Sequence, residues 1–153
     1  MRFTPLAVSD AEALLAVYAD PTMYEFTGGS VPTLAQLSDR LLSQTAPTPE
    51  GTDWLNWVVR SGEETVGVLQ ATVKGSWSVA EVAWEIGVQW WGRGYGSEAA
   101  TAVVAWLVRR GVPDIRAHIH PDHAASAAVA RAAGLEPTDE WIGGEVIWAL
   151  PAP

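Results

Sequence analysis

The sequence contains no cysteine, which excludes disulfides, thiolate metal ligands and a cysteine nucleophile. It has a single lysine, Lys74, and its 9 basic residues stand against 18 acidic ones, a formal net charge of −9. Such a chain cannot build the large basic face of a nucleic-acid-binding protein, so we expect no nucleic-acid partner. The acidity suits a cationic small molecule or a basic peptide as partner, and it is equally consistent with a role in solubility alone.

Long apolar runs are also missing. No run could cross a bilayer, and no charged-then-apolar leader begins the chain, so we expect a cytoplasmic protein without membrane association. The 153 residues, 48% of them hydrophobic, are enough for one domain, 1–153, with a sizeable core. The 9 tryptophans could fill this core or cover the interface of a homodimer.

Hydrophobic periodicity and turn residues predict a mixed α/β chain in the order β-α-α-β-β-β-α-β-α-β-β. The first helix is expected to begin at Ser9, with Glu12 at the capping-box spacing, and to end before Pro21. Thr33 is expected to cap the second helix. The expected strands are 2–6, 54–60, 65–73, 79–88, 115–120, 135–142 and 145–150; the two later helices are 99–110 and 123–133, and a loop covers 22–32.

The segment Trp91 to Glu98 is the most informative part of the chain. Its glycines, Gly92, Gly94 and Gly96, follow a predicted strand and precede a predicted helix. A tight glycine turn at this place exposes backbone N–H groups at the positive end of the helix dipole, which makes an anion site, most often for phosphate. A Walker loop is excluded because its lysine is missing. A dinucleotide fingerprint is disfavoured because Ser97 stands at its third glycine.

This loop resembles the pyrophosphate loop of the GNAT superfamily of N-acetyltransferases, in particular the ribosomal-protein N-acetyltransferase (RimJ/RimL-like) branch. The matching run is Trp91 to Gly96, followed by Ser97, Glu98 and Ala99. Trp91 replaces the Gln or Arg that is usual in the superfamily, but tryptophan is common in this branch.

Two further segments carry the same resemblance. Pro121 to Ser126, followed by Gly134-Leu135, matches the branch motif Pro-x-Asn-x-x-Ser, with His123 where asparagine is usual. Phe3 to Leu6 also looks like this branch, so the similarity covers nearly the whole chain.

The resemblance implies the GNAT fold, a central, mostly antiparallel twisted sheet flanked by helices. Its fourth and fifth strands splay apart at a bulge, here expected at Gly87. It implies acetyl-CoA as co-substrate, with no metal, and a backbone N–H of Ile86 that polarises the thioester carbonyl. The implied cofactor contacts are Ile86, Gly87, Val88, Trp91, Gly92, Arg93, Gly94, Tyr95, Gly96, Ser97, His123 and Ser126.

The catalytic candidates are two glutamates, a serine and a histidine. Glu81 and Glu85 lie at even spacing on one strand, so they share a face unless a bulge separates them, and either could take a proton from the amine. Ser126 is the candidate donor to the leaving thiol, since the tyrosine that many relatives use is absent. His120 is an alternative acid or base.

With no cysteine to carry the acetyl group, the sequence favours direct transfer from acetyl-CoA to a primary amine, on a protein N-terminus or a small molecule. Tyr24, Glu25 and Phe26 could form an aromatic and acidic wall for this acceptor. Two alternatives stay open: a non-catalytic acyl-CoA-binding protein of the same fold, and a transferase of a different acyl group.

Overall fold

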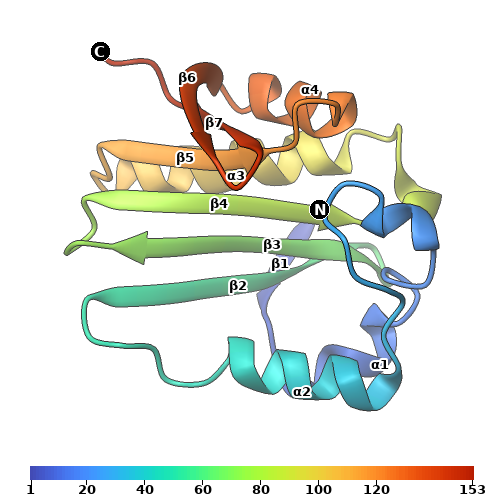
Figure 1. The fold of residues 1–153 in the computed structure, drawn as a ribbon. Coiled ribbons are helices and arrows are strands. Elements are labelled where there is room, and N and C mark those ends of the chain that lie inside the picture. Colours follow the sequence, from blue (N-terminus) through green and yellow to red (C-terminus); the bar gives the residue numbers. More distant parts are fainter.

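A computed structural model describes residues 1–153, and seven strands form one sheet in the order β1-β2-β3-β4-β5-β7-β6 (Figure 1). The strands are β1 (Arg2–Pro5), β2 (Thr52–Ser61), β3 (Glu64–Lys74), β4 (Val79–Ile86), β5 (Asp114–Ile119), β6 (Glu136–Ile142) and β7 (Glu145–Ala149). Every neighbouring pair is antiparallel except β4 and β5. The expected mixed α/β architecture is confirmed.

The sheet splits in its middle. β4 pairs with β3 along its whole length, but with β5 only over Val79–Glu81. Beyond Glu81 the edge of β4 that faces β5 has no strand partner, so its backbone polar groups open into a gap. The predicted splay between the fourth and fifth strands is therefore present.

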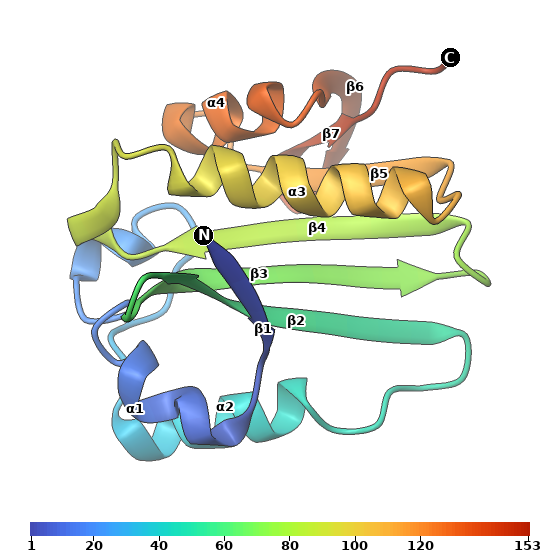
Figure 2. The ribbon, with the colours of Figure 1, turned by 180° about the vertical axis from the view of Figure 1, so that it is seen from behind.

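Four α-helices and three short 3₁₀ segments flank the sheet. They are η1 (Val8–Asp10), α1 (Ala11–Leu14), η2 (Pro21–Tyr24), α2 (Leu34–Gln44), η3 (Val88–Trp90), α3 (Tyr95–Arg109) and α4 (Ala124–Ala132). Figures 1 and 2 show α3 and α4 lying together along β4 and β5, and α1 and α2 lying together beyond β2. No helix has the length and apolar character that crossing a membrane requires.

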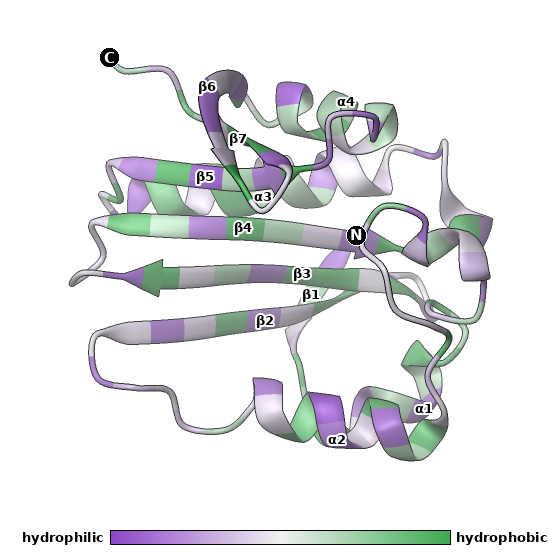
Figure 3. Ribbon diagram, in the orientation of Figure 1, coloured by the Kyte–Doolittle hydropathy of each residue, from purple (hydrophilic) through white to green (hydrophobic).

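The core is a cluster of 31 buried residues that extends from Leu6 to Trp148. Figure 3 shows hydrophobic and hydrophilic residues distributed along the central strands. Residues 65–69 of β3 are buried without a break, as a strand covered on both faces requires, whereas buried and less buried residues alternate along the first half of β4. The helical spacing predicts an apolar stripe on α3 of Ala100, Val103, Val104, Leu107 and Val108; the first four are buried, but Val108 near the end of the helix is exposed.

The cap predicted for the second helix is confirmed. The Thr33 hydroxyl accepts the Gln36 N–H at 3.2 Å, and the Gln36 side chain accepts the Thr33 N–H at 3.0 Å. The strands expected at 135–142 and 145–150 leave two residues for a hairpin turn, and Gly143-Gly144 forms it, with both glycines at positive φ between paired Ile142 and Glu145.

The first helix differs from its prediction. Instead of the expected Ser9–Glu12 capping box, the Asp10 carboxylate accepts the Ala7 N–H at 2.9 Å and begins the 3₁₀ segment η1. The α-helix then ends at Leu14 and gives way to turns, so Tyr18 lies beyond it. Asp10 also forms an ion pair with Arg60 of β2 at 2.7 Å, which joins the start of this helical segment to the sheet.

Candidate functional site

The glycine loop ends inside the helix that follows it. α3 begins at Tyr95, so the last part of the motif forms its first turn rather than preceding it. Gly92 and Gly94 have φ of +76° and +81°, a left-handed conformation that residues with a Cβ rarely adopt. The N–H of Glu98 bonds the Gly94 carbonyl. The N–H groups before it, from Tyr95 to Ser97, precede the first helical bond and lie at the positive end of a 15-residue helix.

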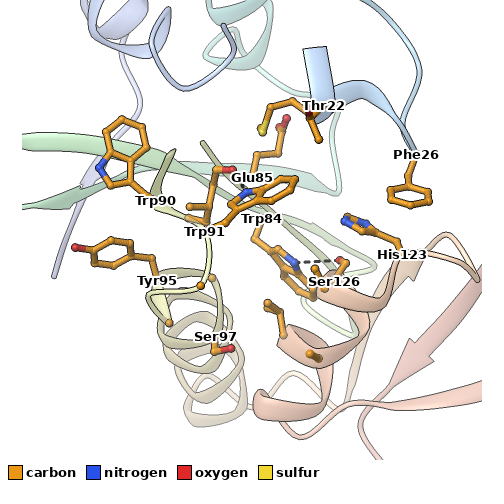
Figure 4. Close-up of a pocket in the computed structure, with 18 of the residues that line it drawn as sticks. Thr22, Phe26, Trp84, Glu85, Trp90, Trp91, Tyr95, Ser97, His123 and Ser126 are labelled. Carbon is orange, nitrogen blue, oxygen red and sulfur yellow. Dashed lines mark hydrogen bonds between the residues drawn. The ribbon is translucent and has the colours of Figure 1, made fainter. Parts of the chain in front are cut away.

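Gly96 brings α3 close to α4. A Cβ at this position would lie 3.1 Å from Cγ2 of Val129, so the absence of a side chain permits the close approach. The two helices and the end of β4 thereby enclose a cavity of about 340 Å³ (Figure 4). Its lining includes Trp91, Gly92, Gly94, Tyr95, Gly96 and Ser97 of the loop, Ile86 of β4, and His123, Ser126 and Val129 beside or on α4.

A second cavity of about 410 Å³ meets the first at the splayed strands. It is lined by Tyr24, Arg40, His118, His120 and Glu145, among others. The residues that line both cavities are Phe26, Thr27, Trp84, Glu85, His123 and Ser126. The site therefore has two compartments with a common wall.

Successive side chains at the end of β4 point to opposite faces of the sheet, and Trp84 and Glu85 each line both cavities. The Ile86 side chain faces α3, because a Cβ on Gly96 would lie 3.7 Å from its Cγ1, and Trp84 reaches Ser126 of α4. Glu85 points the other way, toward Tyr18 and Arg40. This division follows from the alternation of side chains along a strand.

The backbone of Ile86 is directed into the gap. The Gly87 N–H bonds the Val66 carbonyl at 3.0 Å, and because hydrogen-bonded pairs alternate along an antiparallel ladder, the polar groups of Ile86 point away from β3. The Trp91 indole N–H donates to the Ile86 carbonyl at 2.7 Å. The Ile86 N–H faces the gap, as a thioester-polarising donor must.

The bulge expected at Gly87 is absent, since the pairing of β3 with β4 runs to Ile86 without a register shift. Gly87 is needed for another reason. A Cβ there would lie 2.7 Å from two ring carbons of Trp90, so the glycine admits this indole against the strand end. The splay thus comes from β5 turning away from a regular β4.

Glu85 lies in a network that the sequence analysis missed. The Tyr18 hydroxyl donates to its Oε1 at 3.4 Å, and Nη2 of Arg40 lies 3.6 Å from the same oxygen. The Glu85 side chain keeps 44% of its area exposed, where it opens into the cavities. Its desolvation by the surrounding walls raises the pKa of the carboxyl above its ordinary value, while Arg40 and the Tyr18 hydroxyl oppose this rise.

Ser126 is oriented by Trp84. The indole N–H donates to the Ser126 Oγ at 3.2 Å, a contact drawn as a dashed line in Figure 4. The hydroxyl oxygen is thus an acceptor here, and its proton is left to donate elsewhere in the cavity. Trp84 was not predicted as a site residue, although its even spacing from Ile86 could have placed it on the same face.

Two of the three histidines flank Phe26. His123 stacks on the Phe26 ring with centroids 4.5 Å apart, and His120 is tilted against it at 5.1 Å. Burial lowers the pKa of His123, and His120 lowers it further, while Glu25 opposes them. The Nδ1 of His120 accepts the Asp122 N–H at 3.1 Å, so the neutral ring carries its proton on Nε2.

Some predicted residues lie outside both cavities: Glu25, Glu81, Gly87, Val88 and Arg93. Glu81 sits where β4 still pairs with β5, opposite Arg116, and its carboxylate lies 3.3 Å from the Lys74 ammonium. Glu81 and Glu85 do share a strand face, but only Glu85 lies beyond the point where the strands separate.

Comparison with known proteins places these features in a family. A family model described as an acetyltransferase (GNAT) domain matches residues 1–136. No curated protein matches the chain by sequence.

Solved structures share the fold. An acetyltransferase from Thermus thermophilus is 23% identical with a TM-score of 0.78, covering 97% of this chain and 94% of that one. A putative ribosomal-protein-serine acetyltransferase from Vibrio cholerae is 16% identical with a TM-score of 0.76, covering 97% and 91%. The aminoglycoside acetyltransferase AAC(6')-Ib in complex with coenzyme A is 17% identical with a TM-score of 0.75, covering 96% and 91%.

Proposed function

The chain belongs to the acetyltransferase (GNAT) family, and from this premise we propose that it transfers an acetyl group from acetyl-CoA directly to a primary amine. Family membership confirms the resemblance drawn from the motifs and the predicted class, an acyl-CoA-dependent N-acetyltransferase. The observation that carries the finer proposal is the meeting of two cavities at the free edge of β4, with Glu85 and Ser126 in their common wall. The proposal treats residues 1–153 as one domain, which the single hydrophobic cluster supports.

The first cavity is assigned to acetyl-CoA. The pyrophosphate would take the N–H groups at the start of α3, where the dipole favours an anion. The pantetheine arm would follow the free edge of β4, and the Ile86 N–H would meet the thioester oxygen. Loss of one such oxyanion donor typically raises a barrier by about 2.7–4 kcal/mol.

The second cavity is assigned to the amine. Glu85 and Glu145 supply negative charge, and Tyr24 and Phe26 supply aromatic surface, which together suit a cationic acceptor. The names of the structural neighbours suggest two acceptor classes to test, protein N-termini and aminoglycosides.

Glu85 and Ser126 divide the proton transfers. An ammonium acceptor must first lose a proton to attack, and the Glu85 carboxylate takes it. The amine nitrogen then bonds the carbonyl carbon, and the oxyanion forms against the Ile86 N–H. As the C–S bond breaks, the second proton of the nitrogen passes to the sulfur through the Ser126 hydroxyl. The products are the amide and CoA thiol, with one proton released from Glu85 to solvent. His120, on the acceptor side, is the alternative base, and to act as one it must give up the hydrogen bond that its Nδ1 accepts from the Asp122 N–H.

The test combines CoA binding with turnover. Calorimetry with CoA and CoA release over a panel of amines, N-terminal peptides and aminoglycosides measure the two steps separately. Glu85→Gln should lower kcat roughly 10²-fold or more with CoA affinity retained, whereas Glu81→Gln on the same strand should behave as wild type.

Each negative result in these experiments contradicts a different part of the proposal. No CoA binding at millimolar concentration would remove the proposal altogether. Binding without release across the panel would favour a non-catalytic acyl-CoA-binding protein. Preference for propionyl-CoA or succinyl-CoA would indicate a different acyl group, and full turnover in Glu85→Gln would exclude that residue as the base.

A further inference from the structure

The side chains of Tyr18 and Arg40, which belong to no sequence motif, both approach the Glu85 carboxylate. We propose that Arg40 and Tyr18 are positioning residues, which hold Glu85 by one oxygen and keep it ionised as the proton acceptor of the amine. This inference rests on the proposed function, because it assigns Glu85 the role of base.

Two side chains hold one oxygen of the Glu85 carboxylate, and neither of them contacts the second oxygen. Both the Tyr18 hydroxyl, at 3.4 Å, and the Arg40 guanidinium, at 3.6 Å, approach Oε1 of Glu85. Neither contact involves Oε2, so this oxygen can face the cavity. A base held in this way presents a fixed lone pair instead of rotating among partners.

Tyr18 and Arg40 also fix each other. The Arg40 guanidinium lies 4.5 Å from the centroid of the Tyr18 ring, a cation–π contact. Tyr18 is 1% exposed, and the Tyr24 hydroxyl donates to its carbonyl at 3.0 Å. Burial holds the pKa of the Tyr18 phenol well above its ordinary value, and Glu85 raises it further, so the hydroxyl stays a donor throughout the working range.

The charged groups around Glu85 determine the balance between the protonated and the ionised form of its carboxyl. Burial alone favours the protonated form of Glu85, which could not accept a proton, and Arg40 is the nearest opposing cation. The other titratable or charged groups that face the cavities around Glu85 are Tyr18, Tyr24, Tyr95, His118, His120, His123 and Glu145. Of these, only the histidines can add positive charge, and burial lowers the pKa of His123.

The experiment follows the acidic limb of kcat/KM from about pH 4 to about pH 9, which reports the base in the free enzyme. In Arg40→Gln the limb should move to higher pH. At pH values below the limb, kcat/KM should be about threefold to tenfold lower than in wild type, and at pH values above the limb it should return to the wild-type value. Tyr18→Phe, which keeps the ring, should move the limb in the same direction by less. Arg40→Lys, which keeps the charge, should restore most of the wild-type profile.

A second readout needs no turnover. The ¹³C shift of the Glu85 carboxyl carbon, identified by its loss in Glu85→Gln, reports the titration directly in the protein without substrates. It should titrate at higher pH in Arg40→Gln than in wild type, and Lys74→Gln, which removes an exposed cation at the far end of β3 and β4 from Glu85, should leave it unchanged.

The outcomes separate the two proposals. An unchanged Glu85 titration in Arg40→Gln, or a loss of kcat/KM equal at every pH, would overturn the positioning role. If the carboxyl titration shifts as expected but no acceptor is acetylated, the network stands and the proposed function fails.

Discussion

At the scale of single residues, the main feature is Glu85, whose carboxyl lies where its surroundings disfavour the ionised form. The surroundings of Glu85 raise its pKa in the folded protein, so the native state binds its proton more tightly than the unfolded state does. Its proton-linked stabilisation is fully present below the unfolded pKa and is lost as pH rises through the folded pKa. Above the folded pKa the ionised carboxylate therefore reduces the free energy of unfolding, as active-site groups often do.

Glu85→Gln should accordingly melt at a higher temperature than wild type at neutral pH, because the uncharged amide needs less solvation and can still accept the Tyr18 hydroxyl. Below about pH 4, where the wild-type carboxyl is protonated, the difference should vanish. Thermal unfolding at both pH values measures this. Glu81→Gln, whose carboxylate pairs with Lys74 at the surface, should show no such gain, and an equal gain in both variants would contradict the argument.

The hydrogen bond between Trp84 and Ser126 makes a second prediction at this scale. Trp84→Phe keeps an aromatic ring but removes the N–H, so the serine loses its orientation and kcat should fall up to about tenfold. Ser126→Ala should lower kcat further, and the double variant should be no slower than Ser126→Ala, since the indole acts through the hydroxyl. Steady-state kcat with one acceptor tests this, with CoA affinity as control. Additive losses would mean that Trp84 acts independently.

At the scale of elements, α3 carries a matched pair of glycines at its two ends. Gly94 caps its start with φ +81°, and Gly111 follows its end with φ +82°, and neither has an atom within 4 Å of a Cβ added there. Alanine at either position should reduce the free energy of unfolding by about 1–2 kcal/mol, the strain of a left-handed residue.

Only Gly94→Ala should also weaken CoA binding, because Gly94 shapes the turn that aims the N–H groups of α3 at the phosphates. Urea denaturation and calorimetry with CoA measure the two effects on the same samples. If both variants bound CoA equally well, the glycine would be needed for folding alone.

The elements also show what the sequence could predict. Periodicity and turn residues predicted the order of helices and strands along the chain, most of the stripe of α3 and the Thr33 cap, because each depends on neighbours in the chain. The Asp10–Arg60 contact beside the first helix joins residues far apart in sequence. The same applies to Glu81 and Glu85. Their spacing predicts a shared face, but only the tertiary structure shows that β5 departs between them. Tyr18 and Arg40 come from separate segments, so no local pattern could join them to Glu85.

At the scale of the whole molecule, the splayed sheet brings the two cavities together at the end of β4. Trp84 and Ile86 point toward α3 and α4, and Glu85 points toward Tyr18 and Arg40, but Trp84 and Glu85 line both cavities. Because the cavities share a wall at the gap, an amine and a thioester can meet without an acetylated enzyme. The chain also has no cysteine to form one.

The net charge of −9 acts over the same scale. An acidic molecule attracts a polycationic acceptor from beyond contact distance, and salt screens this attraction because the Debye length is about 10 Å at 0.1 M. With acetyl-CoA saturating, kcat/KM for a polyamine should fall several-fold between about 0.02 M and 0.3 M salt. An acceptor of similar size with one ammonium and one carboxylate, and so no net charge, should change little. CoA release against ionic strength compares the two. An equal loss for both would place the salt effect on the protein or on acetyl-CoA, whereas a loss confined to the polyamine would show that the acidity of this chain helps to select its acceptor.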